Sequence, residues 1–106
     1  MNIRISHKVI LKKTAHRFIV VIECPFEPQP GFMFIFRETE KAGDDCALIV
    51  EDIYGWDATN QHLLVRTVDW NVDEWSHNTG GDADELFADA KEQLIRVARC
   101  AHEPPK

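Results

Sequence analysis

The chain has 106 residues, of which 44% are hydrophobic and 28% are charged, and its formal net charge at pH 7 is −6. These values are typical of one globular domain over residues 1–106, and they exclude a wholly disordered chain. The negative charge disfavours nucleic acid as a partner, because phosphate binding needs clustered lysines and arginines. No apolar run approaches the ~20 residues of a membrane span, and Met1 leads into an alternating pattern rather than a signal peptide. We therefore expect a cytoplasmic protein without membrane contact.

The three cysteines lie far apart and lack the Cys-x-x-Cys spacing of metal sites. They are Cys24, Cys46 and Cys100. An odd number at these distances indicates neither a disulfide framework nor a zinc site, so reduced thiols are expected. The five histidines are not spaced as metal ligands either. We expect no metal and no cofactor.

Charge is sorted along the sequence. Residues 38–90 carry fourteen acids against two bases, a local net charge of −12. Residues 1–22 carry no acid and five bases, which are Arg4, Lys8, Lys12, Lys13 and Arg17. Such asymmetry bears on steering and on the choice of partner. These bases are a candidate contact in a larger assembly, and they would favour nucleic acid only as an isolated patch.

Alternation with a period of two predicts strands along most of the chain. Residues 3–12 alternate apolar and polar side chains, which is typical of a strand with one solvated face. After a turn at 14–16, residues 17–24 are apolar on both faces and predict a central strand in a hairpin with the first. Further strands are predicted over 32–37, 46–54 and 62–70. A proline-rich segment at 25–31 precedes the first of them, a charged turn at 40–45 the second, and a polar loop at 55–61 the third.

One helix is predicted near the end of the chain. Residues 71–81 are polar, end in two glycines and are predicted as a loop. Asp82 then stands at an N-cap position, with Glu85 at the matching position of a capping box. Apolar residues recur at three- and four-residue steps over 83–101, which predicts an amphipathic helix. The two prolines that follow prevent its continuation.

Strands first and a helix last predict an α+β fold. We expect a mostly antiparallel, curved meander of about five strands, with the single C-terminal helix packed on one face. Apolar residues on the other face would then stay uncovered: Ile19, Val21, Met33, Ile35, Ala47, Ile49 and Ile53. A second copy of the chain would cover them, so a homodimer is expected. The alternative is a monomer whose sheet curls into a barrel-like shape.

No catalytic motif stands out, and the sequence leans toward a protein that is not an enzyme. Ser76 and His77 are adjacent in sequence, which does not place them in hydrogen-bond geometry. Nothing near Cys24 indicates an activated thiol. The Gly-Gly step before Asp82 precedes a helix N-terminus, but the acids there would repel a phosphate. We identify no catalytic residues.

The first function hypothesis is an interaction module with an acidic, tryptophan-bearing surface. Tryptophan is enriched at binding hot spots, and carboxylates steer a basic partner. Such a module would act as an inhibitor, an immunity protein or an accessory protein of a phage or mobile element. In the alternative interpretation, the tryptophans at 70 and 75 pack inward on the sheet. The residues of the proposed surface are Trp56, Asp57, Asp69, Asp73, Glu74, Trp75, Asp82 and Asp84.

The second hypothesis is a small-ligand module or a minor enzyme with an apolar pocket between the sheet and the C-terminal helix. The candidate pocket residues are His7, His62 and Phe34. His7 falls on the apolar face of the first predicted strand. In the alternative interpretation it is a satisfied core residue with no ligand.

Overall fold

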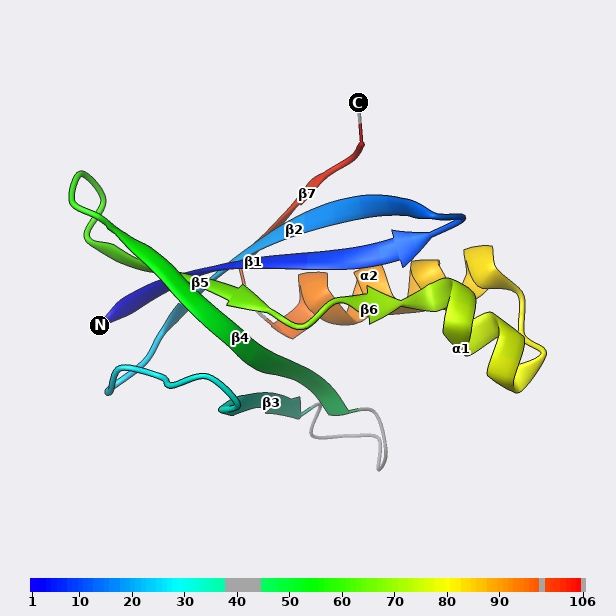
Figure 1. Cartoon of the computed structure of the whole chain (residues 1–106), viewed down its shortest axis with the longest axis horizontal. Helices are drawn as coiled ribbons and strands as arrows, with labels where there is room; N and C mark the ends of the chain where they lie inside the picture. Colours follow the sequence, from blue (N-terminus) through cyan, green and yellow to red (C-terminus); the bar gives the residue numbers. More distant parts are fainter. Residues whose placement is uncertain (38–44, 98, 106) are drawn as a thin grey trace.

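The computed structural model describes residues 1–37, 45–97 and 99–105, and it confirms the α+β class (Figure 1). A mixed, unclosed sheet of seven strands carries two helices. The elements are β1 (Asn2–Leu11), β2 (Thr14–Glu23), β3 (Met33–Arg37), β4 (Asp45–Asp57), β5 (His62–Thr67), β6 (Trp70–Asn71), α1 (Val72–Thr79), α2 (Ala83–Val97) and β7 (Arg99–Glu103). The charged turn predicted around Gly43 lies outside the described residues.

The sheet is not the predicted antiparallel meander, because β1 lies at its centre. The strand order is β3-β4-β5-β1-β2-β7, with the short β6 also paired to β1. β1 runs antiparallel to β2 but parallel to both β5 and β6. Ile5 thus lies between Val20 on one side and Val65 on the other. Alternation identifies a strand and its buried face, but it carries no information about which distant strand lies alongside.

The β1–β2 hairpin turns two residues earlier than predicted. Leu11 pairs with Thr14, so Lys12 and Lys13 alone form the loop. Their φ angles are 51° and 62°, the left-handed conformation that two-residue hairpin loops require. Glycine, asparagine and aspartate favour this conformation, and lysine does not. The sequence therefore lacks the usual signal for a turn at this position.

The predicted loop at 71–81 instead contains helix α1. The side chain of Asn71 caps it by accepting the Glu74 N–H at 3.1 Å, and Gly80 ends it in the left-handed conformation at φ 73°. Both are standard helix-terminating features, and both are visible in the sequence once the short helix is considered. The segment was predicted as a loop because its residues are mostly polar and the helix has only eight residues.

α2 begins after Asp82 as predicted but ends at Val97, and the rest of the predicted helix is strand β7. Asp82 accepts the Glu85 N–H at 3.1 Å, as a helix N-cap does. β7 runs antiparallel to β2, from the pair Arg17–Glu103 to the pair Val21–Arg99. Helical spacing of apolar residues continues past 97, so the pattern alone could not indicate where the helix gives way to a sheet edge.

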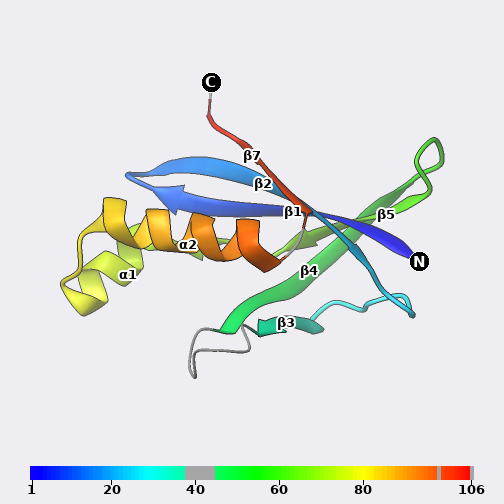
Figure 2. The same ribbon diagram turned by 180° about the vertical axis from the view of Figure 1, so that it is seen from behind.

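Both helices lie on one side of the sheet, where the core is buried (Figure 2). Its fully buried residues include Ile3, Ile5, Phe18, Val20, Leu48, Val65, Val72 and Leu94. On the opposite face, β1 and β2 are largely polar, while Ile19 is buried and Val21 half-buried. Large exposed apolar side chains of that face lie on β3 and β4, with Met33, Ile35 and Ile49 between 37% and 48% exposed.

Candidate functional site

An apolar groove of about 540 Å³ lies between the end of β2 and the edge strand β3. This volume is within the range of ligand-binding clefts. We call it the β2–β3 groove. Its lining residues are Val21, Ile22, Glu23, Cys24, Pro25, Phe26, Phe32, Met33, Phe34 and Ile35. Several of the large side chains are exposed, so the groove is open to solvent along its length.

Unpaired strand edges border the groove on both sides. Consecutive residues of β2 and of β3 line the groove. The side chains of consecutive strand residues point to opposite faces of the sheet, so a groove that contacts all of them must run along the strand edges. β3 is the last strand of the sheet on its side. β7 pairs with β2 only as far as Val21, so Ile22 and Glu23 extend beyond it. Among the described residues, no strand lies between these two edges.

Backbone polar groups of β3 face the open edge. Val50 donates its N–H to the Phe32 carbonyl at 2.8 Å. Bonded positions alternate along an antiparallel ladder, so Phe34 is the next position bonded to β4. The N–H and C=O groups of Met33 and Ile35 therefore point away from β4. They are available to another extended chain.

A chain of phenylalanines forms one wall of the groove. The rings of Phe26 and Phe32 meet edge to face at 5.1 Å, and those of Phe32 and Phe34 at 5.0 Å. Phe34 also packs against the core, whereas Phe26 is 47% exposed and Phe32 38% exposed. The prolines of the 25–31 segment and Gly31, at φ 89°, fix the path of the chain between these rings. The aromatic wall thus packs against the core at Phe34 and is exposed to solvent at Phe26.

The two edges of the sheet differ in how they are protected. The β7 edge carries Glu103 and is followed directly by Pro104 and Pro105, which cannot extend strand pairing. β3 has no proline, and its only charged residue is Arg37, at its end. Within the described parts of the chain, Glu23 is the only charged residue lining the groove. The β3 edge is therefore unguarded and apolar.

Of the three predicted pocket residues, only Phe34 lines the groove. His7 is fully buried in β1, where Nδ1 lies 2.8 Å from Thr67 Oγ1 and the ring meets Trp70 at 4.5 Å. Its Nε2 has no hydrogen-bond partner among the described residues, and burial lowers the pKa of His7 to about 4. His62 begins β5, away from the groove lining. The groove lies between two strands rather than between sheet and helix.

The predicted acidic surface divides between the two ends of the molecule. Trp56 lies in β4 rather than in a loop and is 52% exposed. Asp57 holds the following turn, and its hydrogen bonds from the Asn60 side chain and backbone lower the pKa of its carboxyl group. The β4–β5 turn and α1 lie at opposite ends of the long axis, so these two residues are separated from those on α1 (Figure 1).

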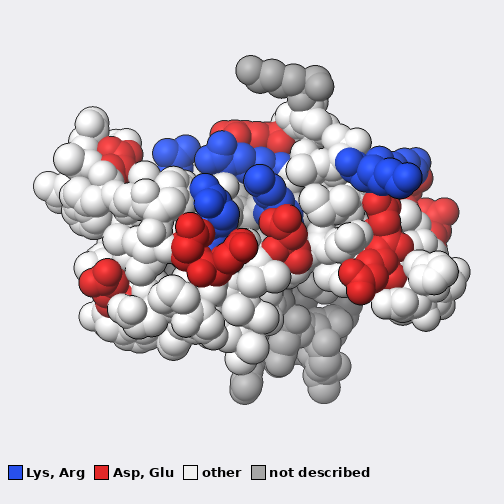
Figure 3. All heavy atoms as spheres, in the orientation of Figure 1, with Lys and Arg blue, Asp and Glu red and all other residues white. Residues whose placement is uncertain are grey.

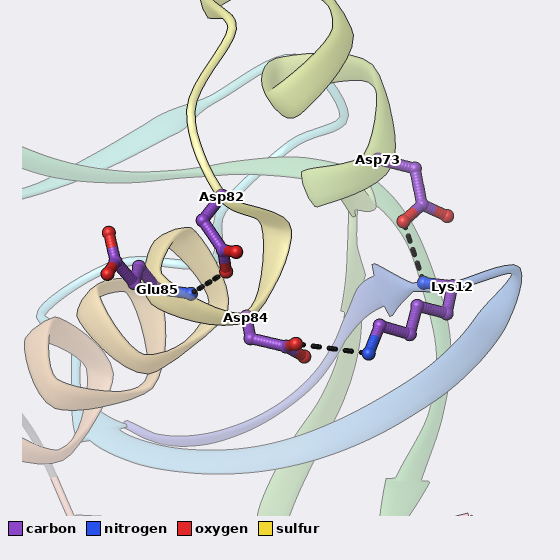
Figure 4. Close-up of polar contacts among 5 residues, drawn as sticks. All are labelled: Lys12, Asp73, Asp82, Asp84 and Glu85. Atoms are coloured by element: carbon purple, nitrogen blue, oxygen red, sulfur yellow. Dashed lines mark hydrogen bonds and ion pairs between the residues drawn. The ribbon is translucent and has the colours of Figure 1, made fainter.

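At the α1 end, several predicted surface acids have internal partners. Asp73 accepts the backbone N–H groups of Lys12 and Lys13, at 2.7 and 2.8 Å. Asp84 forms an ion pair of 3.0 Å with Lys12 Nζ, so that Lys12 lies between the starts of both helices (Figure 4). Figure 3 shows the same adjacency of basic and acidic side chains at the hairpin tip. The opposite charges of the two sequence halves thus meet in the fold.

The other bases of the N-terminal segment are only partly isolated. Arg17 Nε donates to Ser6 Oγ at 3.0 Å, and its guanidinium lies 3.8 Å from Glu103. Lys8 is directly opposite Arg17 in the β1–β2 register and is exposed. Lysines and arginines gather over this part of the sheet in Figure 3. Because acids lie among them, they do not form the isolated patch that nucleic-acid binding would need.

Trp75 and two acids remain exposed at the α1 end. Trp75 is 36% exposed and packs against the half-buried Trp70 with ring centroids 5.8 Å apart. Asp69 and Glu74 are exposed, and their carboxylates make no hydrogen bond or ion pair among the described residues. Trp70 thus points inward, as the alternative interpretation expected, and Trp75 covers it from outside.

No protein-family model, curated protein or solved structure matches this chain. Neither described helix is long and apolar enough to cross a membrane. The described residues contain no cluster of three or more histidine, cysteine or acidic side chains placed to hold a metal ion. The sequence interpretation did not include the β2–β3 groove. Its available signal was a run of large apolar residues, 32–36, directly after a proline-rich segment.

Proposed function

We propose that the protein is a non-enzymatic interaction module that holds a segment of a partner protein in the β2–β3 groove. One observation carries this proposal: Phe26, Phe32, Met33 and Ile35 are all 38–48% exposed around a single groove. Large apolar side chains that gather in this way mark binding surfaces, because leaving them in water costs free energy. Ordinary monomers scatter such residues singly.

The shape and chemistry of the groove favour a peptide chain over a small molecule. Small-ligand sites enclose most of their ligand and orient it with several polar groups. The β2–β3 groove is open along two strands, and Glu23 is the only charged side chain in its lining over residues 1–37, 45–97 and 99–105. The available polar groups belong mainly to the backbone of Met33 and Ile35. Backbone groups in a row recognise another backbone.

A displayed library of random twelve-residue peptides tests this proposal. We expect peptides to be enriched on the native protein and to lose at least ten-fold in affinity for the Ile35→Lys variant. Ile95→Lys is the matched control, because Ile95 is 51% exposed but lies on α2. No enrichment, or equal binding to Ile35→Lys, would overturn the proposal.

A second candidate is docking of a basic partner at the α1 end through Asp69, Glu74 and Trp75. Their exposure, with no internal partner for either carboxylate among the described residues, supports it. Titration with an arginine-rich peptide should quench tryptophan fluorescence at low salt and lose its effect at high salt. Trp75→Phe should remove the response, whereas Trp56→Phe should keep it. A response that survives in Trp75→Phe places the binding elsewhere.

A further inference from the structure

We infer that the partner segment binds as an additional β-strand on β3, and that it carries a basic residue that meets Glu23. This inference rests on the proposed function of the β2–β3 groove and specifies its partner. The bound segment is extended, its alternate side chains are apolar, and its backbone hydrogen-bonds to β3. Binding would extend the sheet beyond its present edge.

The unpaired strand edges determine this mode of binding. Counting the strands that the structure describes, β3 has a partner only on the side of β4, and the end of β2 has one only on the side of β1. The groove between them runs along strand edges, as the consecutive lining residues show. An extended chain can therefore satisfy the free N–H and C=O groups of Met33 and Ile35. Alternate side chains of that chain would contact the aromatic wall.

The contrast between the two sheet edges supports strand addition at β3 alone. Proteins normally protect edge strands with charges or prolines, because unprotected edges pair with other chains. The β7 edge has both kinds of protection, through Glu103 and the prolines that follow. The described part of β3 has neither before Arg37. A strand edge without charges or prolines, next to an apolar groove, is suited to pairing with a strand of a specific partner protein.

Charge determines the kind of segment. Glu23 lines the groove and Glu27 is exposed in the adjoining loop, while no base lines the groove among the residues that the structure describes. The whole chain also has a net charge of −6, which repels an acidic segment and attracts a basic one. A second copy of this chain carries the same net charge and is disfavoured as the occupant. We therefore assign an apolar segment with at least one lysine or arginine.

Backbone N-methylation of the selected peptide tests the strand geometry. Each residue of the peptide is methylated in turn, which removes one hydrogen-bond donor at a time. Strand addition predicts at least ten-fold losses at every second residue of the bound stretch and small changes between them. In parallel, amide exchange of Met33 and Ile35 should slow on binding. If N-methylation shows no alternation while Ile35→Lys still abolishes binding, the groove function stands and strand addition is wrong.

The role of Glu23 is tested separately with Glu23→Gln. We expect a three- to ten-fold loss of affinity at low salt and a smaller difference at high salt, because salt screens exposed charges. Glu85→Gln, at an exposed position on α2, is the control and should bind as the native protein does. Equal binding by Glu23→Gln and native protein would show that no basic residue is recognised there. If no peptide binds at all, the proposed function itself fails.

Discussion

Asp73, in the first turn of α1, accepts the backbone N–H of Lys12 at 2.7 Å across 61 positions of sequence. Its second oxygen accepts the N–H of Lys13 at 2.8 Å. Both lysines have positive φ, a conformation that is unfavourable for residues with a side chain. The acid in the first turn of α1 thus stabilises the strained turn between β1 and β2, and it fixes the helix to the hairpin.

Asp73→Ala should destabilise the fold and lower its melting temperature by several degrees. The substitution leaves two turn N–H groups without their partner, and it removes these two hydrogen bonds between α1 and the β1–β2 hairpin. Asp69→Ala is the control, because Asp69 is an exposed acid without such contacts. Thermal unfolding followed by circular dichroism measures both variants. Equal melting temperatures for Asp73→Ala and native protein would show that the turn holds its shape unaided.

Lys13→Gly should stabilise the protein by about 1 kcal/mol, because glycine adopts positive φ without the strain that a side chain adds. Urea unfolding measures the change. Lys8→Gly, in the extended strand β1, is the control and should destabilise the protein. A loss of stability in Lys13→Gly would mean that the lysine side chain contributes more than its backbone conformation costs.

Stability should decrease as the pH falls from about 6.5 to about 4. Burial lowers the pKa of His7 to about 4, so the folded protein keeps His7 neutral while the unfolded chain takes up a proton below its ordinary value of 6.5. The shift corresponds to about 3 kcal/mol of lost stability at the acid end of this range. Burial, Lys91 and His16 lower the pKa of His102 as well, so His102 acts in the same direction.

Urea unfolding at several pH values, on the native protein and on His7→Phe with Thr67→Val, tests this expectation. The double variant removes the imidazole together with the hydroxyl that lies 2.8 Å from it. Its stability should vary less between pH 6.5 and 4. His77→Gln, at an exposed position on α1, should keep the native dependence. An unchanged slope in the double variant would assign the acid sensitivity to other groups.

Asp82→Ala should destabilise α2 by about 1 kcal/mol, the usual effect of losing an N-cap side chain. The Asp82 carboxylate accepts the Glu85 N–H at 3.1 Å and has no other hydrogen bond among the described residues. Asp89→Ala, further along the same helix, is the control and should be neutral or slightly stabilising. Chemical unfolding of both variants measures the difference. A neutral Asp82→Ala would show that water caps the helix equally well.

The homodimer expected from the sequence can now be tested at a defined surface, the apolar edge at β3. Apolar exposure around β3 favours self-association, but the net charge of −6 on each copy opposes it, so we expect only weak association that rises with concentration and strengthens when salt screens the repulsion. Light scattering should show Ile35→Lys as a monomer, while Ile95→Lys behaves as the native protein does. A tight dimer that excludes the selected peptide would identify the second copy as the occupant of β3, against the strand-addition proposal.

Local patterns predicted local structure well. Alternation located β1, β3, β4 and β5 to within a few residues, and Asp82 correctly marked the start of α2. The strands are recognisable because their buried and exposed faces differ in polarity. Asn71, three residues before Glu74, was also a usable capping signal, but the acidic context obscured it. These features depend on neighbouring residues alone.

Non-local pairing could not be predicted from the sequence. The parallel contact between Ile5 and Val65 depends on which distant strand packs beside β1, and strand alternation is the same for either partner. The pairing of β7 with β2 was hidden for the same reason. The groove arises from this arrangement, because among the described strands the order leaves one edge of β3 and one edge at the end of β2 without a neighbouring strand. The sequence identified Phe34 as a pocket residue from its apolar character alone, because the strands that form the groove around it could not be predicted.

The central position of β1 has a consequence for how the chain is made. A ribosome produces β1 and β2 first, but β5 is complete only roughly 2–9 s later at about 5–20 residues per second. During that interval the nascent hairpin has a free apolar edge on the side that Val65 will occupy. Folding must therefore wait for distant segments, which slows it and favours chaperone contact. Synonymous codons that slow translation between β2 and β5 should lower the yield of native protein.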